Sequence, residues 1–227
     1  MADISAHTDA TEGEATAPEP APPELGFEEF QRIYGPVRAL SPAEAGVLFD
    51  GAPLRWWVAG GWSVELGAEP RRFHEDLEIA VPRDDVPALR EWLRDYHLWD
   101  THDARLQFLA RDMAVPMDHG QLWLRRDAYS PWLLDVMLTP VTGDTWFYKR
   151  DDRISRPLDY VVRVGADGIP YQRPEITLLF KARRRWEKDE ADFSAIAPQL
   201  AVTERAWLRD AIALTEPARH PWLQRLA

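Results

Sequence analysis

Two carboxylates separated by one residue, Asp76-Leu77-Glu78, begin a mostly apolar segment that ends at Pro82. Because side chains two positions apart in a strand project to the same face, both carboxylates would point the same way. Like charges so placed repel unless a cation lies between them, and Mg²⁺ binds carboxylate oxygens together with water and phosphate. The triplet therefore indicates a metal-phosphate site, although a solvated strand face shows the same pattern.

A pair of glycines, Gly60-Gly61, ends the apolar run 55–59 and precedes a short helical segment, 62–66. Glycines at such a turn let backbone N–H groups approach an anion closely. An ordinary strand-to-helix turn is the alternative interpretation, because two adjacent glycines are not a specific signal.

A single acid, Asp135, interrupts the apolar segment 132–138. An aspartate inside such a strand is costly unless it is paired, hydrated or bound to metal. The alternative is a position at the strand edge that faces water.

Basic side chains follow Arg173-Pro174-Glu175 on a predicted helix, and Lys181 comes directly after the apolar residues 178–180. A cationic helix could reach triphosphate oxygens, and Lys181 is the best single candidate. A solvated helical face with i, i+4 ion pairs is the alternative for most of them. His74, just before the acidic triplet, is a candidate phosphate contact or supporting group, or an exposed loop residue.

The elements that must position these residues follow from periodicity and turn signals. Helices are expected within 27–34, over 43–50 after the Ser41-Pro42 start, and over 62–66, 83–96, 189–199 and 202–214, with a further one after Pro174. Strands are expected over 55–59, 76–81, 105–110, 121–126, 132–138, 145–149 and 159–164. This order predicts an α+β fold: a mixed sheet with helices on one side and a C-terminal helical bundle packed on it. Three regions are expected: an acidic disordered tail (1–26), an α+β domain (27–172) and a helical region (173–227).

Composition narrows the function classes. The absence of Cys excludes disulfides, thiolate metal sites and cysteine nucleophiles, and the six His show no metal-ligand spacing. The net charge of -11 lies mostly in the tail: eight of the 38 acids precede Arg32, leaving 30 acids against 27 bases. A nearly balanced body disfavours nucleic-acid binding. With no apolar run long enough for a membrane helix and no signal peptide, no membrane association and a cytoplasmic location are expected.

Three segments taken together are more specific than any of them alone: VAGGWS at 58–63, RRFHEDLEIAV at 71–81 and LLD at 133–135. This set resembles the aminoglycoside 2''-adenylyltransferase family of the nucleotidyltransferase-fold superfamily. Its pattern is Gly-Gly-Trp, then His-x-Asp-hydrophobic-Asp, then a third Asp in a later strand. The segments 173–181 and 188–193 resemble the C-terminal helical part of related members. One position departs from the pattern, because Glu78 stands where the family has Asp.

The resemblance implies a nucleotidyltransferase-type fold and an antibiotic-resistance role, with ATP as nucleotide donor and Mg²⁺ as cofactor. Asp76 and Glu78 would bind the metal, and Asp135 would complete the metal site or accept the proton of an acceptor hydroxyl. Gly60, Gly61 and Ser63 would hold the donor phosphates, with His74 and Lys181 as further contacts. The implied reaction moves AMP to a hydroxyl of a small molecule such as an aminoglycoside.

Two other hypotheses stay open. The chain could be a nucleotide or small-molecule binding module that has lost catalysis, with the longer Glu78 side chain as the first sign of that loss. It could also be an interaction protein, for example a partner in a toxin–antitoxin pair. The acceptor, the base preference and the oligomeric state are not determined by the sequence.

Overall fold

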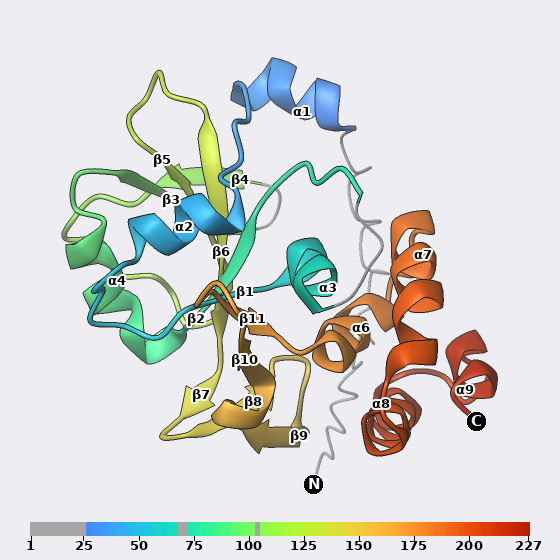
Figure 1. Ribbon diagram of the computed structural model, residues 1–227. Helices are drawn as coiled ribbons and strands as arrows, with labels where there is room; N and C mark the ends of the chain where they lie inside the picture. The colour runs from blue at the N-terminus through green and yellow to red at the C-terminus, as the bar shows by residue number, and fades with distance from the viewer. Residues whose placement is uncertain (1–25, 68–71, 103–104) are drawn as a thin grey trace, which may run out of the picture.

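The computed structural model describes residues 26–67, 72–102 and 105–227, and the expected acidic tail lies almost entirely outside them. The described chain forms a mixed eight-stranded sheet, a small three-stranded sheet and helices packed around both (Figure 1). The predicted α+β class with a mixed sheet and flanking helices is therefore confirmed. No helix in the described ranges combines the length and apolar character needed to cross a bilayer.

The large sheet has the order β10-β11-β1-β2-β6-β5-β3-β4, with parallel pairing between β1 and β11 and between β2 and β6. Its strands are β1 (Trp57–Val58), β2 (Glu78–Pro82), β3 (His97–His102), β4 (Arg105–Phe108), β5 (Gln121–Arg125), β6 (Trp132–Thr139), β10 (Val162–Val164) and β11 (Pro170–Gln172). The small sheet comprises β7 (Val141–Thr142), β8 (Thr145–Tyr148) and β9 (Asp151–Pro157).

The helices, including two short 3-10 segments, occupy the remaining described elements. They are α1 (Phe27–Tyr34), α2 (Pro42–Leu48), α3 (Gly60–Gly67), η1 (Arg83–Asp85), α4 (Val86–Trp92), α5 (Leu158–Val161), α6 (Pro174–Ala182), α7 (Glu187–Ile196), η2 (Ala197–Gln199), α8 (Val202–Thr215) and α9 (Pro221–Arg225). The predicted start of α2 is confirmed: Ser41 and Glu44 form a capping box, and Pro42 is at the first helical position.

Both faces of the large sheet are covered by other elements. Successive residues of a strand point to opposite sides, so β1 and β2 each contribute side chains to both apolar clusters. On one face Val58, Ile79 and Val81 pack with residues of α2 and α4. On the other, Trp57 and Ala80 pack with α3, with the C-terminal helices and with the small sheet. Figure 1 shows α2 and α4 on one side of β2 and β6, with α3 and α6 on the other. The helices are thus not confined to one side.

Several element boundaries differ from those expected. Asp76 precedes β2 rather than lying within it, and the helix predicted over 83–96 is a 3-10 turn followed by the shorter α4. The strand predicted over 159–164 is half helix, since α5 occupies the residues before β10. Strands β3, β7, β9 and β11 and helix α9 were not anticipated. The backbone groups of these strands are satisfied by cross-strand pairing, partly in hairpins such as β8–β9 and partly with distant segments such as β1, which pairs with β11.

Candidate active site

The predicted acids meet along a row that crosses the large sheet. Glu78 of β2 and Asp135 of β6 are direct register partners in a parallel pair. Asp135 is in turn the register partner of Trp123 on the antiparallel strand β5. On the opposite side of Glu78, the N–H of Ala59 donates to the carbonyl of Glu78 at 2.8 Å, which brings the glycine turn alongside. Neighbouring strands lie about 4.8 Å apart, so the row places a glycine turn, two acids and an indole side by side.

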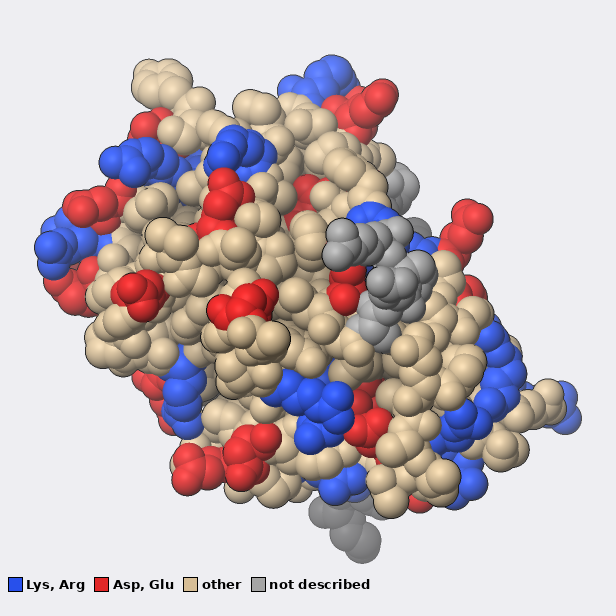
Figure 2. Space-filling view, viewed as in Figure 1, with Lys and Arg blue, Asp and Glu red and all other residues tan. Residues whose placement is uncertain are grey.

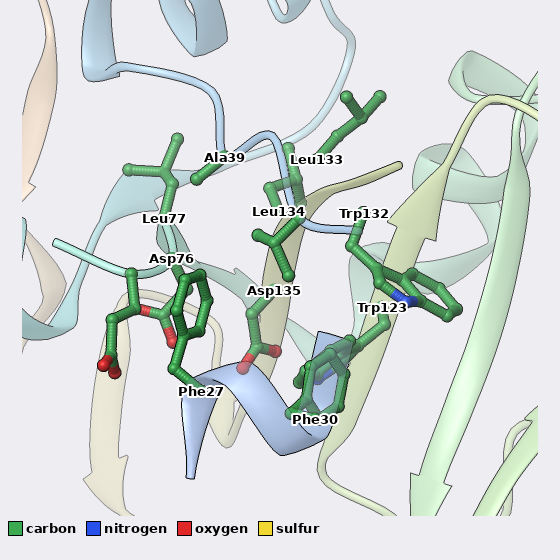
Figure 3. Close-up of a pocket in the computed structure, with 12 residues that line it drawn as sticks. Phe27, Phe30, Ala39, Asp76, Leu77, Trp123, Trp132, Leu133, Leu134 and Asp135 are labelled. Carbon is green, nitrogen blue, oxygen red and sulfur yellow. The ribbon is translucent and has the colours of Figure 1, made fainter. Parts of the chain in front are cut away.

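Asp76 joins this row from the extended segment that leads into β2. The N–H of Asp135 donates to the carbonyl of Leu77 at 2.8 Å, which fixes this segment beside β6. Figure 3 shows the carboxylates of Asp76 and Asp135 turned toward the side on which α1 lies. The structure therefore brings the three predicted acids, Asp76, Glu78 and Asp135, into one electrostatic cluster.

Burial and mutual repulsion shape the titration of this cluster. Burial raises the pKa of Asp135 well above its ordinary value, and the charges of Glu78 and Asp76 raise it further. Burial and the neighbouring Asp76 charge likewise raise the pKa of Glu78. Asp76 is more exposed, but the loss of part of its hydration still raises its pKa. Such a cluster favours either protonation or a bound cation.

Asp135 has one oxygen that nothing in the described chain satisfies. Its side chain is buried, with 4% exposed, and its Oδ2 accepts a hydrogen bond from Nε2 of Gln121. Its Oδ1 is buried without a partner among the described residues. A buried carboxylate oxygen without a partner is costly, so this atom marks a place for a ligand group.

The donor set fits Mg²⁺, because three carboxylates supply the hard oxygen ligands that this ion prefers. The free Oδ1 of Asp135 and the mutual repulsion of the acids agree with a cation at this place. The three carboxylates are nevertheless not drawn together around one point. Within the described ranges, the group whose possible ligand atoms all lie within 4.8 Å of one another is His102, Asp118 and His119.

That histidine group lies on the β3–β5 side of the sheet. The rings of His102 and His119 stack with centroids 3.8 Å apart, and Nδ1 of His119 hydrogen-bonds with Oδ2 of Asp100. Sequence spacing gave no sign of it, because His102 and His119 are brought together by the fold.

The glycine turn is in direct contact with the acids. Gly60 has φ of +57°, and a Cβ on it would lie 1.4 Å from Oε2 of Glu78. A Cβ on Gly61 would lie 2.3 Å from Nη2 of Arg72 and 2.8 Å from Nδ1 of His74. Gly60 therefore requires glycine, while a Cβ on Gly61 would displace the Arg72 guanidinium and crowd the His74 ring. The turn opens α3, whose first N–H groups lack intrahelical partners and favour an anion.

Two of the residues expected at the phosphates serve the scaffold instead. The Ser63 hydroxyl is fully buried, donates to the carbonyl of Gly60 at 2.8 Å and lies 2.7 Å from Oγ1 of Thr177. His74 stacks on Trp62 with centroids 4.3 Å apart, and its Nε2 lies 2.9 Å from Oε2 of Glu65. Burial lowers the pKa of His74. Both side chains therefore make contacts within the protein next to the glycine turn.

Lys181 is already paired. Its Nζ lies 2.7 Å from Oδ1 of Asp189 and 3.0 Å from Oδ2 of Asp192. Burial alone would lower the pKa of Lys181, but these two ion pairs outweigh burial and raise it. Arg72 also pairs with Asp192, at 3.2 Å, so the network ties α6 and α7 to the segment before β2. In this structure the Lys181 ammonium is held by α7 rather than offered to a ligand.

Two lysines that were not predicted as site residues, Lys149 and Lys188, interact electrostatically with the acids. Lys149, after β8, interacts electrostatically with Asp135 and Glu78, although burial lowers its own pKa. Lys188 lowers the pKa of Asp76 and lies 3.8 Å from Oε2 of Glu75. Gln121 is a third unexpected neighbour, through its bond to Asp135. No local pattern pointed to Lys149, which follows β8, or to Gln121, which begins β5.

A pocket of about 160 Å³ opens beside Asp76 and Asp135. Its walls are largely aromatic and aliphatic, and Figure 3 shows Phe27 and Phe30 of α1 facing it across from Trp123 and Trp132. Elsewhere, acidic and basic side chains are interspersed over most of the face seen in Figure 2.

The family comparison agrees with this geometry. A model of the family described as aminoglycoside-2''-adenylyltransferase matches residues 45–147. That range contains the glycine turn and all three acids. The match supports the resemblance to this family over that part of the chain. The comparison with curated proteins found no match.

The chain is also similar to several solved structures. The lincosamide antibiotic adenylyltransferase LnuA, bound to lincomycin, is 19% identical over 70% of this chain and 97% of its own, with a TM-score of 0.46. The antibiotic-resistance factor ANT(2'')-Ia is 14% identical over 79% of this chain and 90% of its own, also with a TM-score of 0.46. JHP933 from Helicobacter pylori is 12% identical over 81% of each chain, with a TM-score of 0.39.

Proposed function

We propose that this protein is a Mg²⁺-dependent nucleotidyltransferase that moves AMP from ATP to a hydroxyl group of a small molecule. The observation that carries the proposal is the row formed by Gly60 at the start of α3, Glu78 of β2 and Asp135 of β6, with Oδ1 of Asp135 buried and unpaired among the described residues. Phosphoryl transfer needs an anion-binding turn, a carboxylate metal site and a proton acceptor, and this row supplies candidates for all three.

The donor triphosphate would bind at the Gly60-Gly61 end. The turn lets backbone N–H groups approach phosphate oxygens without side-chain obstruction, and the start of α3 favours negative charge. Lys149 and Lys188 add positive charge near the acids. Asp76 and Glu78 would hold Mg²⁺, which leaves Oδ1 of Asp135 for the acceptor hydroxyl. When bound, the ion would neutralise the acids and stabilise negative charge on the phosphate oxygens.

The acceptor hydroxyl would lie at Asp135. Its proton passes to Oδ1 of that carboxylate while the hydroxyl oxygen forms a bond to the α-phosphorus of ATP. The bond between the α-phosphorus and the bridging oxygen breaks, and pyrophosphate leaves with that electron pair. The raised pKa of Asp135 suits this role, because a more basic carboxylate accepts a proton more readily.

The acceptor class is proposed on the family alone. The matching family takes its name from an aminoglycoside acceptor, so aminoglycosides are the first antibiotics to test, and their modification would confer resistance.

The test is incubation of the full chain with Mg²⁺, α-labelled ATP and a panel of hydroxylated acceptors. The expected result is labelled acceptor and one pyrophosphate for each AMP transferred. Asp76→Asn should remove the activity, because it deletes a metal ligand and a charge while keeping nearly the same shape. Glu78→Asp should retain activity and Glu78→Gln should not, because the carboxylate rather than its length is required.

Folded wild-type protein that releases no pyrophosphate with any acceptor would contradict the proposal. If such a protein still bound ATP in a calorimeter, the inactive binding module would be the correct alternative. Full activity in Asp76→Asn would place the chemistry elsewhere in the molecule.

A further inference from the structure

Two residues that line the aromatic pocket beside Asp135 each have a buried polar atom with no partner among the described residues. One is Oδ1 of Asp135, an acceptor, and the other is Nε1 of Trp123, a donor. The two residues are register partners on β6 and β5, so their side chains emerge on the same face of the sheet. Both residues line the pocket. Unpartnered buried groups of opposite type, on paired residues that line one pocket, call for a ligand that both donates and accepts.

A hydroxyl group meets this requirement with one atom. Its hydrogen can be donated to Asp135, and its oxygen can accept from the Trp123 indole. A primary amine in its charged form could only donate, and a carboxylate could only accept. The remaining Oδ2 of Asp135 is already occupied by Gln121, which leaves Oδ1 for the ligand.

The pocket walls restrict which kind of molecule can bring this hydroxyl group into the pocket. Phe30 packs against Trp123 with centroids 4.8 Å apart, and Trp132 meets Trp123 edge-on at 5.4 Å. Aromatic faces bind apolar surface well and offer few hydrogen bonds to a fully polar ring. The volume is about 160 Å³, and an apolar cavity of roughly 150 Å³ holds one benzene ring. One ring therefore fits, and a chain of several rings does not.

The wall formed by α1 is anchored to β6. The indole N–H of Trp132 donates to the carbonyl of Tyr34 at 3.0 Å, and its backbone N–H donates to the carbonyl of Pro36 at 2.9 Å. These bonds hold Phe27 and Phe30 over the pocket although α1 has no fully buried residue of its own. Glu75 and Asp76 at the rim add negative charge, which disfavours an anionic ligand.

We propose that this pocket is the acceptor subsite and that it selects a single ring with an apolar or aromatic face and one inward hydroxyl group. The ring is neutral or cationic, and the hydroxyl lies between Trp123 and Asp135. This inference rests on the proposed nucleotidyl transfer and defines the part of the acceptor that enters the site. A larger acceptor would insert one such ring and leave its remainder in solvent.

Binding of small probes to the full chain tests the inference without requiring turnover. The probes are 4-(aminomethyl)benzyl alcohol, its partner without the hydroxyl (4-methylbenzylamine), the anionic 4-(hydroxymethyl)benzoate and the polar ring glucosamine. Affinities are measured by NMR titration of the indole N–H signals. We expect the amino alcohol to bind most tightly and to shift the Trp123 signal, which is identified as the one missing in Trp123→Phe.

The variant Trp123→Phe keeps an aromatic wall and removes the donor. It should weaken the binding of the amino alcohol by about two- to tenfold, the usual contribution of one hydrogen bond, and leave the affinity for 4-methylbenzylamine unchanged. Trp99→Phe is the matched control, because Trp99 is the register partner of Trp123 on β3 and also has an unpaired Nε1, but does not line the pocket. It should change neither affinity.

Equal binding of the probes with and without the hydroxyl would overturn the inference, and so would glucosamine or the benzoate binding as tightly as the amino alcohol. These comparisons use wild-type protein and do not depend on the folding of a variant. Discriminating binding without AMP transfer would support the pocket and contradict the proposed function. AMP transfer to glucosamine in preference to the aromatic alcohol would support the function and overturn the pocket.

Discussion

The two faces of the central strands β2 and β6 carry opposite kinds of residue. Ile79, Val81, Val136 and Leu138 form a closed apolar core against α2 and α4. Glu78 and Asp135 immediately precede Ile79 and Val136, so their side chains lie on the other face. There, Oδ1 of Asp135 is buried without a partner among the described residues. Successive side chains of a strand point to opposite faces, so the same two strands carry both kinds of residue. One face holds the strands in register, and that register aligns the acids.

The sharpest test of this contrast exchanges one residue on each face. Asp135→Asn should lower the rate of AMP transfer by about 10²- to 10⁴-fold, the usual effect of removing a proton acceptor, while the fold is kept. Ile79→Ala, next to Glu78 but on the apolar face, should cost about 2–5 kcal/mol of unfolding free energy and leave the rate of the folded fraction nearly unchanged. Rates and denaturant titrations of both variants provide the measurement. Similar losses of activity in both would erase the distinction between the faces.

The glycine turn gives a second test, in which backbone strain is matched. Gly60 and Gly143 have φ of +57° and +58°, but only at Gly60 would a new Cβ meet another group within 4 Å. Each change to Ala should cost about 1–2 kcal/mol in stability from the left-handed backbone. Gly60→Ala should in addition displace the Glu78 carboxylate and strongly reduce AMP transfer, whereas Gly143→Ala should not. Equal activity of the two folded variants would show that close approach at Gly60 is not needed.

The acidic face should also destabilise the fold near neutral pH. In the folded protein the pKa of Asp135 is raised by burial and by Glu78 and Asp76, while Gln121 and Lys149 oppose the shift. Between the unfolded and folded pKa values the folded chain binds more protons, so its unfolding free energy falls as pH rises. Asp135→Asn removes this loss, and the thermal midpoint at pH 7 should rise by about 2–4 °C, the shift that ~1 kcal/mol produces at this size.

The measurement is calorimetry of both proteins between pH 4 and pH 8 without added metal. Toward pH 4 the difference between the two proteins should shrink, because Asp135 is then increasingly protonated in the unfolded chain as well as in the folded one. A wild-type midpoint that rises relative to Asp135→Asn as pH increases would have the wrong sign and refute the idea.

The smallest effect is expected at the surface charge of Lys188. Its ammonium lies 3.8 Å from Glu75, and both side chains are 48% exposed. Exposed pairs contribute little, so Lys188→Ala should change the unfolding free energy by less than about 0.5 kcal/mol. Its charge also acts on Asp76, so the KM for ATP should rise about twofold at low salt and approach that of wild type at high salt. A large loss of stability would mean that this pair is structural.

Local sequence signals determined much of the scaffold. The capping box at Ser41, the helix start at Pro174 and the apolar run of β6 depend on neighbours a few residues away, and the structure has all three. The glycine pair and the acids at 76, 78 and 135 were identified as a set through their resemblance to a known family. The order of the expected elements predicted the α+β fold, which was confirmed, and the family model matches residues 45–147, where the resemblance lies.

Only the tertiary structure decided which side chains surround those acids. Gln121 and Trp123 meet Asp135 through cross-strand register, and Phe30 reaches Trp123 from a helix far away in the chain. Lys181 followed an apolar stripe as expected, yet it pairs with Asp189 and Asp192 because α7 folds back on α6. Register and helix docking depend on apolar contacts summed over distant segments, which no local pattern encodes. The sequence by itself therefore determined the acids and the fold that carries them, and the packing of the sheet decided the shape and chemistry of the pocket beside them.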